Sequence, residues 1–367
     1  MPETTAPTPP RHLDYLDSAR GIAAMMVVIY HYIGWKYEHL TVIKAASILF
    51  NGADAVSFFF VLSGFVLSYK YIVLDQPLDI RKFYITRFFR LWPAFFLIVL
   101  LNALNSIRNE FSLHNLMNIF IFNKTQFWEE AILFRSHPSY YIPGWTLTIE
   151  LSLSFLVPFW VFLAKKNVQL IYWLILANLL AAAELFNIHF LLGIILSCLI
   201  IRISDRSFKD TKWHRYRYYI LFVAAVLFSI RHITRISPIG PTYTYIADYL
   251  RINYFFYTGI ASFIFIAAIL NSPKAQKILR HRFLLFLGKI SYGIYLCHWV
   301  LVTDIFIYWD NITPHFPNTK VAFIVVLCIY SLTTILLATI LHYAVELPFI
   351  SLGKRLANKF KPSLVIK

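Results

Sequence analysis

Two residues that could do chemistry bracket an apolar segment near the start of the chain. Arg20 begins the run RGIAAMMVVIYH and His31 ends it. In an α-helix the eleven steps from Arg20 to His31 make about three turns and rise about 16 Å, so both side chains lie on one face. Arginine binds phosphate groups and histidine exchanges protons near neutral pH. One helix face would therefore join a phosphate-binding group near a membrane surface to a proton acceptor well inside the membrane.

Other ionisable residues also lie within apolar stretches, where they are costly and therefore candidates for function. Glu150, in GWTLTIELSLSF, is expected about six residues below the outer end of its helix, at the depth of His31. His298 is predicted near mid-membrane, and a satisfied packing histidine is the alternative. Asp54 falls in the first turn of a helix, where the dipole alone favours an acid. Glu346, in HYAVELPF, is predicted to be a structural pair or a hinge.

A cationic cluster is predicted at the start of the third apolar segment. RKFYITRFFRLWP contains Arg81, Lys82, Arg87 and Arg90, and the last two lie one helical turn apart. Together with Arg20 they would suit a phosphate-bearing ligand at the cytoplasmic face. Ordinary anchoring at the membrane surface is the alternative, and it explains Arg81 and Lys82 better than Arg90.

A glycine flanked by serines lies in the second apolar segment, FFFVLSGFVLS. Ser63, Gly64 and Ser68 would permit close packing of two helices. The functional alternative is a thin place where a narrow ligand passes between helices, with Ser63 and Ser68 beside it.

The composition places all these residues in a membrane. Hydrophobic residues make up 59% of the 367 residues and charged residues 14%, against roughly 25% charged in a soluble domain. The net charge of +16 is scattered over the connections between apolar blocks, which favours cytoplasmic loops over nucleic-acid binding. The three cysteines, Cys198, Cys297 and Cys328, lie inside apolar spans without metal-ligand spacing, so no metal is expected.

The pattern predicts an all-α polytopic membrane protein with about ten transmembrane helices. Most of the Lys and Arg residues fall in alternate connections, which predicts that both termini are cytoplasmic. The predicted spans are 19–36, 53–72, 87–104, 145–164, 168–184, 186–203, 217–231, 251–271, 287–309 and 321–346.

One membrane domain accounts for nearly the whole chain. Residues 1–12 are polar and proline-rich, which predicts a disordered tail rather than a secretory signal. We assign 13–350 to the transmembrane domain and 351–367 to a basic cytoplasmic tail. The long outer connection at about 105–144 is rich in aromatic residues and is expected to form a folded cap.

The motifs together resemble the membrane-bound acyltransferase-3 family, the O-acyltransferases of cell-surface carbohydrates. Six motifs occur in family order over about residues 13–350, without the soluble hydrolase-like domain that many members append. They are the Arg20–His31 pair, DAVSFFFVLSGF, the run with Arg87, Arg90, Trp92 and Pro93, WTLTIE with Trp145 and Glu150, GKISYGIYLCHW with Tyr292 and His298, and VELP with Glu346 and Pro348.

The resemblance implies a reaction across the membrane. Acyl-coenzyme A, with acetyl as the default acyl group, would approach from the cytoplasm and would bind to Arg20, Arg87 and Arg90. The acceptor would be a hydroxyl of a carbohydrate or lipid-linked glycan on the outer side of a bacterial cytoplasmic membrane. His31 would act as the general base, and Glu150 would orient its imidazole. Asp54, His298, Tyr292 and Trp145 would support the site, and no metal is implied.

Two other functional classes remain open from the sequence. A proton-coupled transporter or flippase could use His31 and Glu150 as a proton relay. Such proteins usually show internal repeats or paired broken helices, and the sequence shows neither. A scaffolding membrane protein would leave the buried charges unexplained. The sequence does not determine the oligomeric state, the acceptor sugar or the acyl group.

Overall fold

The computed structural model describes residues 12–37, 48, 50–122, 124–132, 138–180, 186–204, 212–236, 254–360 and 365–366. The predicted disordered tail lies outside these residues, except for its last residue. The ends of the fifth and eighth predicted spans and parts of the outer connection also lie outside them. The described chain is almost entirely helical, which confirms the all-α class.

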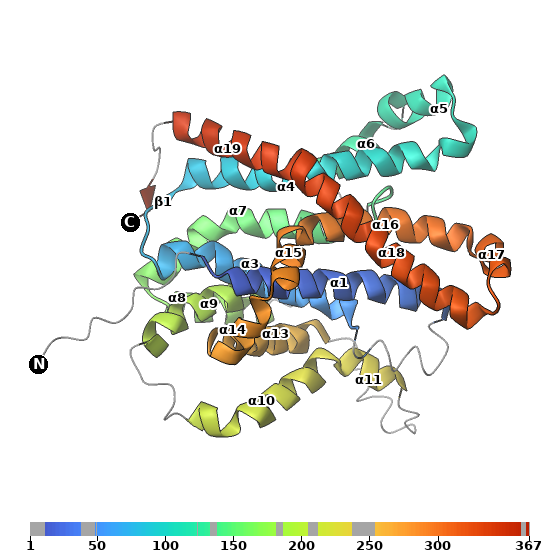
Figure 1. The fold of residues 1–367 in the computed structure, drawn as a ribbon. Helices are drawn as coiled ribbons and strands as arrows, with labels where there is room; N and C mark the ends of the chain where they lie inside the picture. Colours follow the sequence, from blue (N-terminus) through green and yellow to red (C-terminus); the bar gives the residue numbers. More distant parts are fainter. Residues whose placement is uncertain are drawn as a thin grey trace, which may run out of the picture.

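Each of the ten predicted spans overlaps a long helix in its described part (Figure 1). These helices are α1 (Asp14–Tyr37), α3 (Gly52–Ile72), α4 (Ile80–Ser106), α7 (Gly144–Lys166), α8 (Gln169–Leu180), α9 (Phe186–Ser204), α10 (Lys212–Phe228), α13 (Tyr254–Leu270), α16 (Ser291–Ile307) and α18 (Thr319–Leu341). The ninth predicted span, 287–309, also includes the end of α15 (Arg282–Lys289), which is bent by 69° from α16.

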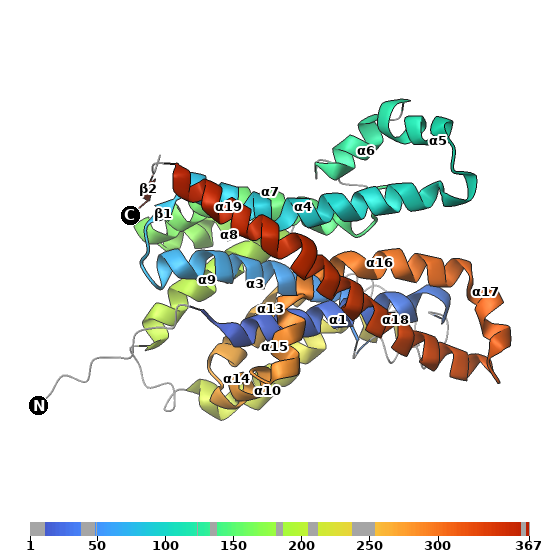
Figure 2. The ribbon, with the colours of Figure 1, turned by 45° about the horizontal axis from the view of Figure 1, so that its top comes forward.

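Shorter elements connect these helices. They are the helices α5 (Leu113–Met117), α6 (Lys124–Ala131), α11 (Ile230–Ile236), α14 (Pro273–Leu279), α15 (Arg282–Lys289), α17 (Trp309–Ile312) and α19 (Leu347–Lys359), the 3₁₀ turns η1 (Arg108–Glu110) and η4 (Thr313–His315), and the π-helical turns η2 (Asn118–Phe122) and η5 (His342–Glu346). Strands β1 (Leu78–Asp79) and β2 (Val365–Ile366) pair antiparallel, so the end of the chain lies beside the start of α4 (Figure 2).

Four helices are long and apolar enough to cross a membrane by themselves: α3, α4, α7 and the continuous α18–η5–α19. Two bent pairs, α13 with α14 and α15 with α16, raise this to six within the described chain. Large apolar side chains point outward from several of these helices, for example Phe159 on α7 and Leu332 on α18, which are 53% and 67% exposed. The hydrocarbon chains of a bilayer would cover such an apolar surface, so the protein is an integral membrane protein. The count of ten spans stays a prediction.

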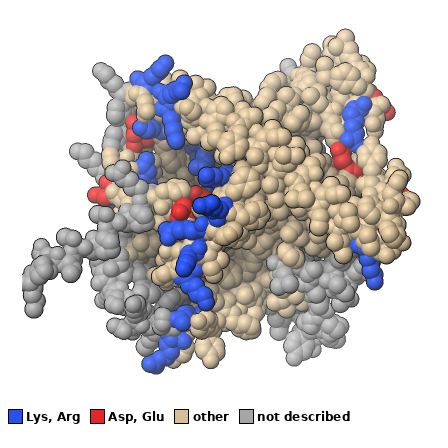
Figure 3. Space-filling view, in the orientation of Figure 1, with Lys and Arg blue, Asp and Glu red and all other residues tan. Residues whose placement is uncertain are grey.

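Charge is concentrated at one end of the bundle. In Figure 1 the start of α1 and the end of α19 lie on the same side, and Figure 3 shows Lys and Arg gathered there while the middle of the molecule carries few charges. At this end the Lys165 ammonium lies 2.6 Å from the Asp75 carboxylate and holds the pKa of Asp75 below its usual value. The predicted positive-inside orientation would make this end cytoplasmic.

Helices α3 and α9 pack with their backbones in direct contact. A Cβ atom at Gly64 would overlap the carbonyl oxygen of Phe190, and one at Gly193 would overlap that of Val61. Gly64 therefore has the packing role that was predicted for the segment FFFVLSGFVLS: its missing side chain lets the two helices approach.

Gly64→Ala should lower the thermal stability of the protein, because the added methyl group must push α9 away. Overpacking of this kind costs about 1–3 kcal/mol. Gly34→Ala is the matched control on α1, since a Cβ there meets nothing within 4 Å. Thermal unfolding in one detergent checks both variants, and equal midpoints would contradict the close packing.

The orientation can be tested with single cysteines in a background that lacks the exposed Cys328. We expect Glu129→Cys, on α6 in the outer connection, to react with an impermeant maleimide on intact cells. Lys277→Cys, on α14, should react only after permeabilisation. Both residues are exposed in the structure. The opposite labelling pattern would invert the topology.

Candidate active site

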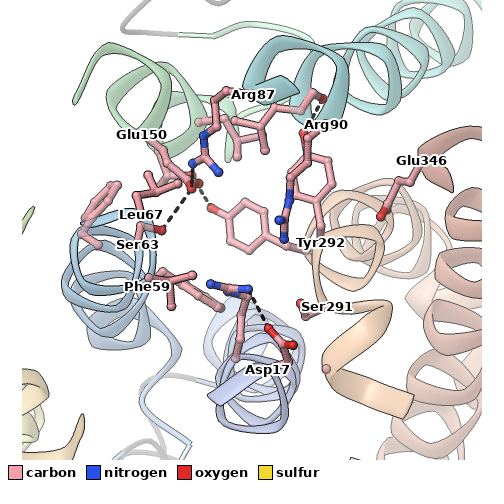
Figure 4. A pocket seen from close by; sticks show the side chains of 18 of the residues that line it. Asp17, Phe59, Ser63, Leu67, Arg87, Arg90, Glu150, Ser291, Tyr292 and Glu346 are labelled. Atoms are coloured by element: carbon pink, nitrogen blue, oxygen red, sulfur yellow. Dashed lines mark hydrogen bonds and ion pairs between the residues drawn. The ribbon is translucent and has the colours of Figure 1, made fainter. Parts of the chain in front are cut away.

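A cavity of about 180 Å³ opens among α1, α3, α4, α7, α15, α16 and the η5–α19 junction. Figure 4 shows that side chains from widely separated parts of the sequence converge on it. Its polar and ionisable lining residues are Asp17, Arg20, Ser63, Arg87, Arg90, Thr146, Glu150, Lys289, Ser291, Tyr292, Tyr295, His342 and Glu346.

An ion pair between α4 and α7 forms one wall of this cavity. The Arg87 guanidinium lies 2.5 Å from the Glu150 carboxylate, and the Ser63 hydroxyl donates to the same carboxylate oxygen at 3.1 Å. Arg87 also donates from Nε to Ser154 at 3.1 Å. The arginine and glutamate side chains are only 10% and 19% exposed, so each charge depends on the other for its stabilisation.

Three further cations face the cavity. Arg20 is held by Asp17 at 3.3 Å, one turn away on α1. Arg90 is exposed and has no hydrogen-bond or ion-pair partner among the described residues, and Lys289 is exposed at the end of α15. Figure 4 shows Arg87 and Arg90 extending from α4 toward the cavity. Arg90 is therefore free to bind an anion that enters this space.

Tyr295 also lines the cavity. Its hydroxyl shares a hydrogen bond with Thr146 at 2.7 Å, and its carbonyl accepts a hydrogen bond from Tyr141 at 2.6 Å. Its ring centroid lies 5.5 Å from that of His298. The ring of Tyr295 thus stands between the cavity and a buried histidine.

His298 in turn lies against His31, with their ring centroids 5.0 Å apart. His31 hydrogen-bonds through Nδ1 to the Val27 carbonyl at 3.1 Å, and His298 does the same to the Tyr295 carbonyl at 2.6 Å. A carbonyl oxygen only accepts, so each neutral ring carries its hydrogen on Nδ1 and keeps Nε2 as its basic nitrogen. In the described structure the buried Nε2 of His298 has no partner. Two imidazoles thus offer basic nitrogens in one place.

The predicted contact between Glu150 and His31 was wrong. Among the described residues Glu150 bonds to Arg87 and Ser63, whereas His31 meets Val27, Tyr30, His298 and Trp299. A count of residues from each helix end gives a depth but no rotation or neighbour. Glu150 shares the cavity with Arg20, which lies three turns of α1 away from His31.

Two of the serine and acid candidates, Ser68 and Asp54, lie outside the cavity lining. Ser63 lines the cavity, but Ser68 is buried between α3 and α9, where it bonds to the Gly64 carbonyl and to Ser197. Asp54 is also outside the cavity lining. It accepts a short hydrogen bond from Asn51, whose side-chain oxygen is 2.9 Å from His232.

Of the two aromatic candidates, Tyr292 lines the cavity and Trp145 does not. Tyr292 lines the cavity and donates its hydroxyl to the Leu91 carbonyl at 2.7 Å, which ties α16 to α4. Trp145 is half-buried outside the cavity lining, with its ring 5.6 Å from Phe186.

Sequence reasoning missed the role of Tyr295 and underestimated Glu346. Tyr295 lies within SYGIYLCHW, one helical turn before His298, and this spacing could have indicated it. Glu346 forms the predicted structural pair, with His342 at 2.9 Å, but the π-helical turn η5 also places it on the cavity wall. Its second oxygen has no partner in the described structure.

These features define a membrane enzyme with a cationic cavity beside two packed histidines, the buried His298 and the half-buried His31. An acyltransferase-3 family model, described as an acyltransferase domain, matches residues 13–343, so the chain belongs to this family and is an acyltransferase. No curated protein and no solved structure matches the chain. Within the described ranges, no three His, Cys, Asp or Glu side chains gather in a way that could hold a metal ion.

Glu150→Gln should destabilise the protein, because it leaves the Arg87 charge buried without a counter-charge. Breaking a buried pair from one side costs about 3–5 kcal/mol. The double variant Arg87→Met with Glu150→Met should recover most of that stability, since it removes both charges. A double-mutant cycle of thermal unfolding with Arg87→Met, Glu150→Met and the double variant measures the coupling, and additive effects would show that the two side chains do not interact.

Proposed function

We propose that the protein transfers an acyl group, most simply acetyl, from acyl-coenzyme A to a hydroxyl of a cell-surface carbohydrate or its lipid-linked precursor. The observation that carries this proposal is the order of groups along one path. Arginines line the cavity, and one of them, Arg90, has no ion-pair partner among the described residues. Tyr295 also lines the cavity, His298 packs against Tyr295, and His31 packs against His298.

The donor binds through its phosphates. Arg90 is the group best suited to hold them, because in the described part of the chain it has no ion-pair partner to give up, and Lys289 and Arg20 add positive charge to the same cavity. Arg87 is already paired with Glu150 and shapes the wall. From Arg20 to His31 the helix rises about 16 Å, a span that the extended pantetheine arm covers.

The chemistry takes place beyond Tyr295. Nε2 of His31 accepts the proton of the acceptor hydroxyl as its oxygen attacks the thioester carbonyl. The carbon–sulfur bond breaks, an ester forms, and the thiolate of coenzyme A takes up the proton from the imidazolium. His298 packs against His31 and holds the base in position, the role that the sequence had suggested for Glu150. The acyl group reaches the histidines past the ring of Tyr295.

The acceptor arrives from the opposite side of the membrane. His31 lies eleven residues beyond Arg20 on a helix that starts at the basic end of the bundle, so it is the part of the site farther from that end. This arrangement supports a donor on the cytoplasmic side and an acceptor on the outer side, in a bacterial cytoplasmic membrane.

The function is tested by incubating purified protein with acetyl-coenzyme A and with longer acyl-coenzyme A donors. We expect slow release of free thiol without an acceptor and faster release with a suitable glycan, with the acylated product identified by mass spectrometry. A proton-coupled transporter would release no thiol. The absence of thiol release with every donor would contradict the proposal.

Arg90→Ala should raise the KM for acyl-coenzyme A about tenfold or more and leave kcat nearly unchanged. A charge-assisted hydrogen bond is worth about 1.5–3 kcal/mol, and this one is made equally in the ground and transition states. Lysine at position 90 should restore only part of the affinity, because it cannot make a bidentate contact. Arg81→Ala is the matched control, since Arg81 is exposed on the first turn of α4 outside the cavity lining. Equal KM values for all these variants would remove Arg90 from the donor site.

His31→Ala should lower kcat about 10²–10⁴-fold, the usual loss of a general base, while the protein stays folded. His298→Ala should lower kcat less, because His298 positions the base. Initial rates at saturating donor, together with thermal unfolding, check both variants. Wild-type turnover in a folded His31→Ala protein would contradict the assigned chemistry.

A further inference from the structure

A second, larger cavity lies on the other side of α1 from the candidate active site. It has a volume of about 1100 Å³ and is bounded by α1, α3, α10, α13 and α14. Figures 1 and 2 both show α10, α13 and α14 grouped beside α1. This space exceeds the 300–1,000 Å³ of a usual small-molecule pocket.

The two cavities are separate because they use opposite faces of α1. Asp17 and Arg20 face the candidate active site, whereas Ile22 and Met26 face the second cavity. At about 100° per residue, Ile22 and Met26 are turned by about 200° and 240° from Arg20. A ligand in the second cavity would therefore touch none of the groups assigned to acyl transfer.

The walls of the second cavity are mostly apolar, and they reach the surface. Phe58, Leu221 and Phe265 are among the lining residues. Two other lining residues, Tyr218 and Ile278, are 70% and 59% exposed, so the cavity opens between α10 and α14. Water gains little in so large an apolar space, whereas the chains of a lipid would fill it.

The polar side chains of the lining gather mainly at one end, where α10 begins and α13 turns into α14. Arg217 donates to the Tyr218 hydroxyl at 3.2 Å and also lies over the Tyr218 ring. Asn271 donates to its own helix, and Ser272 accepts from the backbone of α14. Lys274 is exposed and has no hydrogen-bond or ion-pair partner among the described residues. An unpaired ammonium thus stands at the mouth of an apolar cavity.

We propose that this cavity binds an anionic phospholipid, with its acyl chains between α1, α10 and α13 and its phosphate against Lys274 and Arg217. Charge complementarity selects the occupant. A zwitterionic lipid carries its own cation beside the phosphate, so it would leave the positive charge of Lys274 and Arg217 without net compensation, and a free phosphate would leave the apolar walls empty. The site lies at the same basic end of the bundle as the start of α1, because Arg280, just after α14, is 3.0 Å from Asp14.

The test uses the full-length protein in bilayers of equal phosphatidylglycerol and phosphatidylcholine, extracted gently and examined by native mass spectrometry. We expect retained phosphatidylglycerol to exceed phosphatidylcholine. Lys274→Gln should reduce this retention about fivefold, since one surface cation contributes about 1 kcal/mol to binding an anionic lipid. Lys277→Gln is the matched control, because Lys277 is exposed on the same helix but outside the cavity lining.

Equal retention of the two lipids, or equal losses in the two lysine variants, would overturn the proposal. Displacement of phosphatidylglycerol by millimolar inorganic phosphate would also overturn it, because the site would then recognise phosphate without the chains. A second variant, Ala268→Phe, fills the cavity wall and should reduce lipid retention although it leaves Lys274 in place. If this variant does not fold, a series of phosphatidylglycerols with shorter chains should show weaker retention, and constant retention would contradict chain binding.

Discussion

The cost of placing charge inside a membrane governs this structure. Arg87 and Glu150 enter the bundle from α4 and α7, and neither could stay there ionised without the other. Their pairing brings the two helices together, and Ser63 adds α3 to the same carboxylate. The cavity exists where these three helices meet α1 and α16. The paired charges support its wall, and Arg90, which has no ion-pair partner within the described ranges, remains available to a ligand.

In the proposed function, helix α1 separates donor binding from the chemistry. Arg20 lies in the cavity, and His31 lies three turns farther along, against His298. A rigid helix fixes this spacing better than a loop could. The hydrogen bonds from both histidines to backbone carbonyls fix their tautomers, so their basic nitrogens need no rearrangement before they act.

Much of this arrangement could be predicted from the sequence. Apolar segments and basic connections indicated a helix at each of the ten predicted spans, because hydropathy depends on local composition. Helical spacing also predicted that Arg87 and Arg90 lie one turn apart. The sequence could not predict which side chain on a neighbouring helix each residue contacts. Glu150 was expected beside His31 and lies beside Arg87, since the rotation and neighbours of a helix depend on packing throughout the bundle. Ser68, a candidate for a place beside a ligand, bonds instead to Ser197, and this neighbour also depends on how the helices pack.

The central claim is that coenzyme A occupies the arginine-lined cavity with its thiol toward Tyr295 and the two histidines. The most direct measurement is an electron cryo-microscopy structure of the protein with bound coenzyme A. The account predicts phosphate density within hydrogen-bond distance, about 3 Å, of the Arg90 guanidinium, and the pantetheine arm running toward Tyr295. Density for coenzyme A in the apolar cavity behind α1, or on the face of the bundle opposite the basic end, would contradict it.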